Sequence, residues 1–299
     1  MIMSAAVQFP EEYTVSESIS PTPADLVITP RDLRVGDVKG SERWWHGGDP
    51  AATAFYNALS ASFPLGERFF IESVKRFRHC ADGRLSRQID AFVMQESIHS
   101  REHIAFNAVA TDHGYDLSRI DAFLKQRFQW ARSRGALEQL ASTIALEHFT
   151  AIMAHEALSN PQHFEGTPDS IQRLWRWHAM EEIEHKAVAF DTYLAATRSM
   201  SGMRRWLLRC HVMFISTVLF LHEIAFGARE FFRQDNVNTP RMWLRFLRYV
   251  FVKPGLMRRV LGAYFSYYRP GFHPWNIDDR GLIREFEASP AGQAMLSAA

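Results

Sequence analysis

At 299 residues the chain is long enough for one large domain or two ordinary ones. Its 34 basic and 33 acidic residues leave a formal net charge of +1, so no overall field favours a nucleic-acid partner, and we expect none. Two cysteines, Cys80 and Cys210, are too few for a disulfide framework or a thiolate-rich metal site. The first ten residues lack the basic region and the long apolar region of a secretory signal, which favours a cytoplasmic protein.

The N-terminal 45 residues differ in composition from the rest of the chain. Residues 1–45 are rich in Pro, Ser, Thr and Asp, with β-prone pieces such as 25–29 and no sustained periodicity, so we predict an extended arm. Beyond them apolar residues recur at three- and four-residue spacing between Gly and Pro breaks, which predicts an all-α fold. The predicted helices are 50–79, 85–112, 117–132, 136–158, 168–199 and 203–233.

We divide the helical part into a metal-binding bundle at 46–200 and a C-terminal helical extension at 201–299, packed together as one structural unit. Residues 212–221 are apolar all round, but a membrane span needs about twenty such residues, so a buried core helix is predicted. Residues 242–275 mix aromatic side chains with Arg. We interpret them as amphipathic helix packed on the bundle, with docking to a membrane surface as the alternative.

Two predicted helices carry a Glu-x-x-His step inside an apolar stripe. The first is Glu96-x-x-His99, and the second is His178-x-x-x-Glu182-x-x-His185, which has a further histidine one turn upstream. Residues three or four apart share a face of a helix, so each motif aims its carboxylate and imidazole groups at one point. A buried carboxylate without a partner is costly, and a divalent cation compensates that cost well.

A dinuclear site in a four-helix bundle needs one more Glu from each of the two remaining helices. On 136–158 the apolar stripe contains Glu147. On 50–79 two acids compete: Glu67 lies on the apolar stripe, whereas Glu72 lies among charged residues. We choose Glu67, because a ligand must face the bundle interior.

Other polar side chains near these motifs receive different roles. We interpret His103 as a partner of a ligand, with an eighth ligand or a core imidazole as the alternatives. His148 and His155 are assigned to the polar face or to a network, and Glu156 is interpreted as a charge near the end of its helix, off the apolar stripe. Glu181 and Glu184 lie on the face opposite the ligands. We expect them to be solvated or paired with Lys186 and Arg176.

The predicted ligand set is Glu67, Glu96, His99, Glu147, His178, Glu182 and His185. It resembles that of the ferritin-like di-iron carboxylate proteins, and the added His178 resembles the seven-ligand version in the arylamine N-oxygenase relatives. The stretches 63–70, 95–103, 146–150 and 268–275 are similar to a bacterial family of predicted metal-dependent hydrolases, over about residues 45–280. The resemblance implies a ferritin-like four-helix bundle that has additional C-terminal helices and binds two metal ions.

The chemistry of such a site depends on its metal. Carboxylate-rich coordination suits iron, with manganese as the alternative, and is a poor match for structural zinc. With iron, the implied reaction uses dioxygen as cosubstrate and needs an electron-donor protein. Hydrolysis by a metal-activated water is the alternative, and a non-catalytic metal protein is the third hypothesis. The many Phe and Trp residues near the motifs favour a hydrophobic or aromatic small-molecule substrate, although ordinary cores are also rich in them. We further expect a homodimer.

Overall fold

The computed structural model describes residues 21–34, 38 and 41–296, and their secondary structure is entirely helical. The principal helices are α1 (Pro50–Arg76), α2 (Gly83–Asp112), α3 (Ser118–Arg132), α4 (Ala136–Ser159), α5 (Asp169–His185), α6 (Val188–Ala196) and α7 (Gly202–Gln234). The C-terminal helices are α8 (Pro240–Phe251), α9 (Leu256–Arg259), α10 (Leu261–Ser266), α11 (Arg280–Ala288) and α12 (Pro290–Leu296). The predicted all-α class is confirmed.

Local signals set the ends of these helices. The side chain of Asp49 accepts hydrogen bonds from the backbone at the start of α1, and Asp82 does the same at the start of α2. The predicted helix 168–199 is interrupted at Lys186, where α5 ends. The Lys186 ammonium group lies 2.6 Å from a carboxylate oxygen of Asp279, so a contact with the C-terminal segment accompanies the break.

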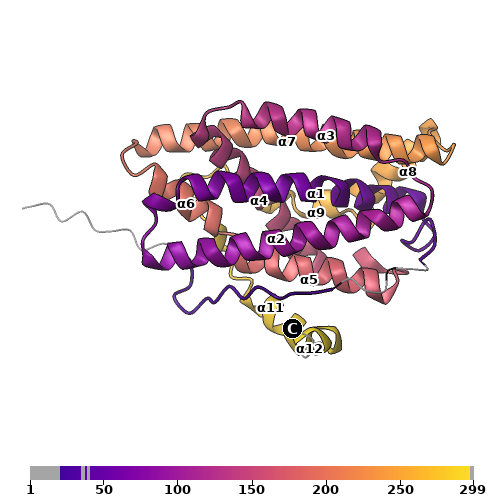
Figure 1. The fold of residues 1–299 in the computed structure, drawn as a ribbon, viewed down its shortest axis with the longest axis horizontal. Helices are drawn as coiled ribbons and strands as arrows, with labels where there is room; N and C mark the ends of the chain where they lie inside the picture. The colour runs from indigo at the N-terminus through magenta and orange to yellow at the C-terminus, as the bar shows by residue number, and fades with distance from the viewer. Residues whose placement is uncertain (1–20, 35–37, 39–40, 297–299) are drawn as a thin grey trace, which may run out of the picture.

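Four helices form the centre of the molecule. The α1 helix packs along α2 and the α4 helix packs along α5, and α1 also contacts α4. Figure 1 shows the long axes of these helices running roughly side by side, with α3 and α7 along one edge of the molecule. The four helices that the sequence analysis assigned to a metal site therefore surround one interior.

The described part of the N-terminal arm lies across α2 and α5. The backbone N–H of Thr29 donates to Glu184 on α5, and the Gln95 amide on α2 donates to the Thr29 carbonyl oxygen. Figure 1 shows this indigo segment running beneath both helices. The β-prone piece 25–29 forms no strand, and residues 1–20 of the predicted arm lie outside the described residues. The domain boundaries at 45 and 200 stay predictions.

The α7 helix packs on α1 and α4 with only part of its surface. Gly227 allows a close approach, because a Cβ there would lie 2.7 Å from the Cβ of Ala58 on α1. The sequence predicts that residues 212–221 form a buried core helix. Met213 is buried, as predicted, but Phe214 is 63% exposed, so the prediction is wrong for that side of the helix. By length and composition α7 could cross a membrane, with 39% of its apolar window buried, but one such helix is weak evidence because core helices pass the same test.

Candidate metal centre

The structure brings all seven predicted ligands together in the interior between α1, α2, α4 and α5. Each of these side chains is buried, with at most 4% of its residue surface exposed. Glu67 comes from α1, Glu96 and His99 from α2, Glu147 from α4, and His178, Glu182 and His185 from α5. Three overlapping groups of these residues have ligand atoms within 4.8 Å of one another, which is the spacing that a shared cation requires.

Most of the polar atoms that face this interior lack hydrogen-bond partners, although His178 Nε2 and Glu182 Oε1 lie 2.8 Å apart. The atoms without a partner are Glu67 Oε1, both carboxylate oxygens of Glu96 and of Glu147, Glu182 Oε2, His99 Nδ1 and His185 Nε2. Buried polar groups in proteins are almost always paired, and an unpaired one is destabilising by about 1–3 kcal/mol. Eight such atoms gathered at one point fit a metal centre, because cations bind the lone pairs that no protein donor reaches.

Two carboxylates lie between the histidines in a way that suits bridging ligands. On one side, His185 Nε2 lies 3.3 Å from Glu96 Oε1 and 3.4 Å from Glu182 Oε2. On the other side, His99 Nδ1 lies 4.0 Å from Glu96 Oε2 and 3.6 Å from Glu182 Oε1. Each carboxylate thus presents one oxygen to each side, as a bridge between two metal ions would.

The remaining ligands separate into the same two sides. Glu147 Oε2 lies 3.5 Å from His185 Nε2, whereas Glu67 Oε1 lies 4.0 Å from His178 Nε2. The side chains therefore form two groups, which we call subsites: Glu147 and His185 would hold one ion, and Glu67, His99 and His178 would hold the other, with Glu96 and Glu182 facing both. The additional histidine makes the two subsites chemically unequal.

Four carboxyl groups in one buried place repel one another. Burial and the neighbouring carboxylates raise the pKa of Glu67 and Glu96 well above the usual range, and burial raises that of Glu147 to about 8. Burial alone would lower the pKa of His185, but the charge of Glu182 raises it to about 9. Without cations the centre must hold protons, whereas two divalent cations would balance the four carboxylates without them.

One histidine is oriented by a carboxylate that the N-terminal arm neutralises. The Nε2 atom of His99 lies 3.0 Å from Glu181 Oε2, which leaves Nδ1 directed at the centre. The other oxygen of Glu181, Oε1, accepts a hydrogen bond of 3.0 Å from the backbone N–H of Arg31. The guanidinium group of Arg31 lies 3.4 Å from the same Oε1 atom. Carboxylates that hold the far nitrogen of a ligating histidine fix its ring orientation and raise its basicity.

A second chain of contacts connects Arg31 with the other subsite. The Nδ1 atom of His185 lies 3.0 Å from the Gln95 side-chain oxygen, and the Gln95 amide donates to Glu184 at 2.8 Å. Arg31 Nη2 lies 2.8 Å from Glu184 Oε1. A single arginine from the arm therefore supports the orienting partners of a histidine in each subsite.

The third histidine is held from the opposite end of the site. His103 Nε2 lies 2.6 Å from His178 Nδ1, and the Ser60 hydroxyl lies 2.8 Å from His103 Nδ1. His103 is thus behind His178 as seen from the centre, the place that the sequence analysis favoured for it. A direct ligand role would require one of its nitrogens to exchange its present partner for a metal ion.

The prediction that Glu181 and Glu184 are solvated, or paired with Lys186 and Arg176, is wrong. Glu181 is fully buried and Glu184 is 3% exposed, and both pair with Arg31. Neither pairs with Lys186, which binds Asp279 instead. The sequence shows no signal for this, because α5 has a second buried face only when the arm covers it.

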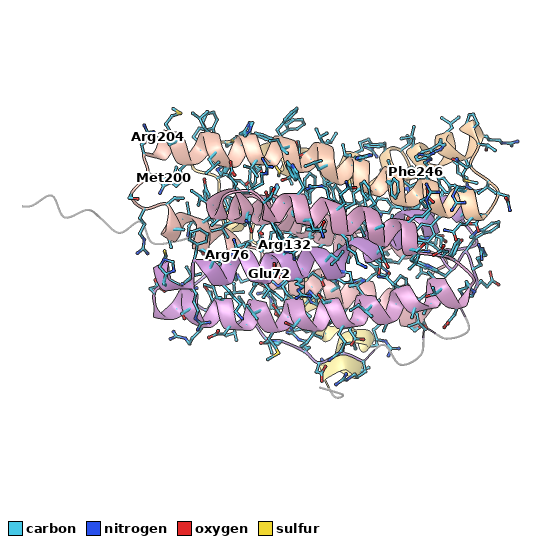
Figure 2. All side chains as sticks on the ribbon, turned by 45° about the horizontal axis from the view of Figure 1, so that its top comes forward. Glu72, Arg76, Arg132, Met200, Arg204 and Phe246 are labelled. Carbon is cyan, nitrogen blue, oxygen red and sulfur yellow. The ribbon has the colours of Figure 1, made fainter. Side chains whose placement is uncertain are left out.

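The other acids and histidines considered in the sequence analysis lie outside the centre. Glu72 forms an ion pair of 2.7 Å with Arg132, and Figure 2 shows both residues. His155 Nδ1 lies 2.9 Å from an Asp279 oxygen. Two others have partners elsewhere: His148 contacts the Ala263 carbonyl oxygen, and Glu156 contacts His163. None of them is within reach of the seven ligands.

Comparison with known proteins identifies the family. A family model described as predicted metal-dependent hydrolase matches residues 29–278, and the chain belongs to that family. No curated protein and no solved structure matched. Family membership supports a metal-dependent enzyme and agrees with the hydrolase alternative of the sequence analysis. It gives no support to the oxygenase interpretation or to a di-iron ligand pattern.

Removal of one predicted ligand should reduce the metal content of the chain. We expect about two ions per chain in the unmodified protein and at most one in Glu147→Gln, because this substitution keeps the side-chain volume but removes the charge. Elemental analysis of purified, folded protein measures the ratio. Glu72→Gln is the matched control and should retain both ions; equal loss in the two variants would show that the centre is misassigned.

Arg31→Ala should weaken metal binding without touching a ligand. Loss of the cation leaves Glu181 and Glu184 buried without a counter-charge, so we expect metal affinity to fall roughly 10- to 100-fold and the free energy of unfolding to fall by about 3–5 kcal/mol. Competition with a chelator and chemical denaturation measure the two effects. Arg34→Ala removes an exposed arginine of the same arm, 70% exposed and paired with Asp32, and should change little.

The metal-free protein should lose stability as pH rises from 7 to 9. Its folded state holds a proton on Glu147 up to about pH 8 and on His185 up to about pH 9, whereas the unfolded chain releases these protons near pH 4.5 and 6.5. Metal ligation replaces those protons, so the loaded protein should show a smaller fall. Calorimetry of chelator-treated and metal-loaded samples compares the slopes, and equal slopes would contradict the assignment.

Proposed function

We propose that this protein is a dinuclear metal-dependent enzyme that acts on an apolar small molecule. The observation that carries this proposal is the set of eight unpartnered ligand atoms from four helices, in which Glu96 and Glu182 each face both subsites. Iron or manganese suits such carboxylate-rich coordination. Bound cations would polarise a substrate oxygen and lower the pKa of a water molecule.

Two cavities support an apolar substrate. The larger, which we call the outer cavity, has a volume of about 230 Å³, lies between α1, α3, α4 and α7, and reaches Glu67. A smaller cavity of about 50 Å³ reaches His178 and Glu182. Both are lined mainly by apolar side chains, and both are lined by Phe63 and Thr150. A substrate could therefore place its apolar body in the outer cavity and its reactive group beside the ligands.

The chain's own residues would hold the reacting group in place and keep water away. The Phe63 ring lies 4.9 Å from the His178 ring, so it forms an apolar wall directly beside the centre. The Trp177 ring packs edge-on at 4.9 Å from His99. Such walls strengthen electrostatic interactions inside the site, because they lower the local dielectric constant.

Hydrolysis of an ester or phosphoester is the first reaction class, because it agrees with the description of the family. Oxidation with dioxygen is the second candidate. A specific feature favours it: the centre combines four carboxylates with three histidines in mainly apolar surroundings, as the resemblance to di-iron proteins implies. An oxidation would need an electron donor, which hydrolysis does not.

An assay without oxygen separates the two reactions. We expect the manganese-loaded protein to hydrolyse p-nitrophenyl hexanoate anaerobically, and faster than the acetate ester, because the longer chain fills the outer cavity. Glu147→Gln should abolish this turnover, and Glu72→Gln should retain it. Absence of hydrolysis together with dioxygen uptake by the reduced iron form would favour oxidation instead. Absence of both reactions in metal-loaded protein would overturn the proposal of an enzyme.

A further inference from the structure

The helices from α7 to α10 expose an unusual amount of apolar surface. Of the sixteen large hydrophobic side chains that are exposed among the described residues, eleven lie between residues 203 and 265. We call them the C-terminal apolar face: Met203, Leu207, Phe214, Val218, Leu221, Leu244, Leu247, Phe251, Val252, Leu261 and Phe265. Exposed apolar side chains gathered on a few neighbouring helices mark an interaction site in a folded protein.

On α7 these residues form a single stripe. From Met203 to Leu221 the five members fall within an arc of about 60° at 100° per residue and extend for about 27 Å. The side of α7 next to the stripe contacts α10, where Thr217 Oγ1 lies 3.0 Å from the Tyr264 hydroxyl. Phe265, the next residue along α10, is 61% exposed. Figure 1 shows α8 beside the C-terminal end of α7, and Figure 2 marks Arg204 near its start.

Positive charge borders this surface. Residues 236–270 contain no Asp or Glu and seven basic residues: Arg241, Arg245, Arg248, Lys253, Arg258, Arg259 and Arg269. On α8, Leu244, Leu247 and Phe251 form one exposed row. Arg241, Arg245 and Arg248 form the adjacent exposed row, while Phe246 and Val250 are buried beneath. Helices that lie in a membrane interface combine an inserted apolar row with basic side chains at headgroup level in this way.

We propose that the C-terminal apolar face docks the protein peripherally on a bilayer containing anionic lipids. A symmetric contact with a second copy fits less well, because a two-fold interface would place segment 236–270 against itself with seven basic residues on each side, of which Arg245 and Arg259 pair with Asp49 and Glu156. An anionic bilayer accepts both the apolar rows and the arginines. On the flank of the stripe opposite Thr217, His211 and Ile215 line the outer cavity, so a docked protein would present that cavity to membrane-dissolved substrates; only this consequence rests on the proposed function.

Vesicle co-sedimentation of the full-length, metal-loaded chain tests the proposal. The protein should bind phosphatidylcholine vesicles with 30 mol% phosphatidylglycerol more tightly than pure phosphatidylcholine vesicles, and 0.5 M salt should weaken the binding. The double substitution Arg241→Gln with Arg248→Gln should weaken it roughly 30-fold. Arg87→Gln with Lys125→Gln removes two exposed charges from α2 and α3 and should change it little.

A second pair of variants tests the apolar contribution. Leu207→Gln with Phe214→Gln should reduce vesicle binding at least tenfold, estimated from the lost burial of two large side chains. Met94→Gln with Ile104→Gln replaces two side chains of comparable exposure on α2 and is the matched control. The proposal would be overturned if the protein bound neither kind of vesicle. It would also be overturned if the α7 pair and the α2 pair of substitutions reduced vesicle binding equally.

Further measurements distinguish the other outcomes. A dimer in size-exclusion chromatography that Leu207→Gln with Phe214→Gln dissociates, in a chain that binds no vesicles, would assign the face to a second copy and overturn membrane docking. Metal content and ester hydrolysis are measured on the same preparations without vesicles. A protein that binds no metal and hydrolyses no ester would overturn the proposed function and leave membrane docking intact. The two proposals can therefore be contradicted independently.

Discussion

The structure depends on the burial of four carboxyl groups at one point. Glu67, Glu96, Glu147 and Glu182 come from four different helices and meet in the interior, where no Lys or Arg of the described residues pairs with them. An apolar residue at any of these positions would pack more easily, so the arrangement is stable only if protons or cations compensate the charge. That requirement explains why the histidines lie on the same stripes and why so many ligand atoms have no protein partner.

The same constraint extends outward from the centre. Two histidines need partners for their far nitrogens, and those partners include two further buried acids, Glu181 and Glu184. These acids are in turn neutralised by Arg31, which lies about 150 residues earlier in the chain. The arm is thus part of the electrostatic balance of the centre, and its attachment to α5 and the geometry of the metal ligands are coupled.

The two faces of α7 meet different demands. Its inner side packs against α1 and α4 and lines the outer cavity, whereas Phe214 and Val218 extend outward. A helix used only to close a bundle would gain solubility from polar residues on that outer side. The apolar cavity, the apolar outer stripe and the basic C-terminal segment are the features on which both proposals, an apolar substrate and docking to a membrane, rest.

Sequence by itself determined the helices and the buried cluster of acids and histidines at their centre. A repeat of 3.6 residues, interrupted by Gly and Pro, locates α1 to α4 and α7 within a few residues, because these signals are local. Glu-x-x-His steps on apolar stripes identify the inward acids, since a stripe that packs inward must carry any polar residue on it into the interior.

Only the tertiary structure decided which contacts surround that cluster. Glu181 and Glu184 read as solvated in sequence, and their burial follows from an arm that folds over α5 from far along the chain. The break after α5 and the sharing of Glu96 and Glu182 between two subsites likewise depend on side chains from other helices. The physical reason is that periodicity records which face of a helix is apolar, whereas charge pairing and coordination depend on distances between segments that sequence spacing does not encode.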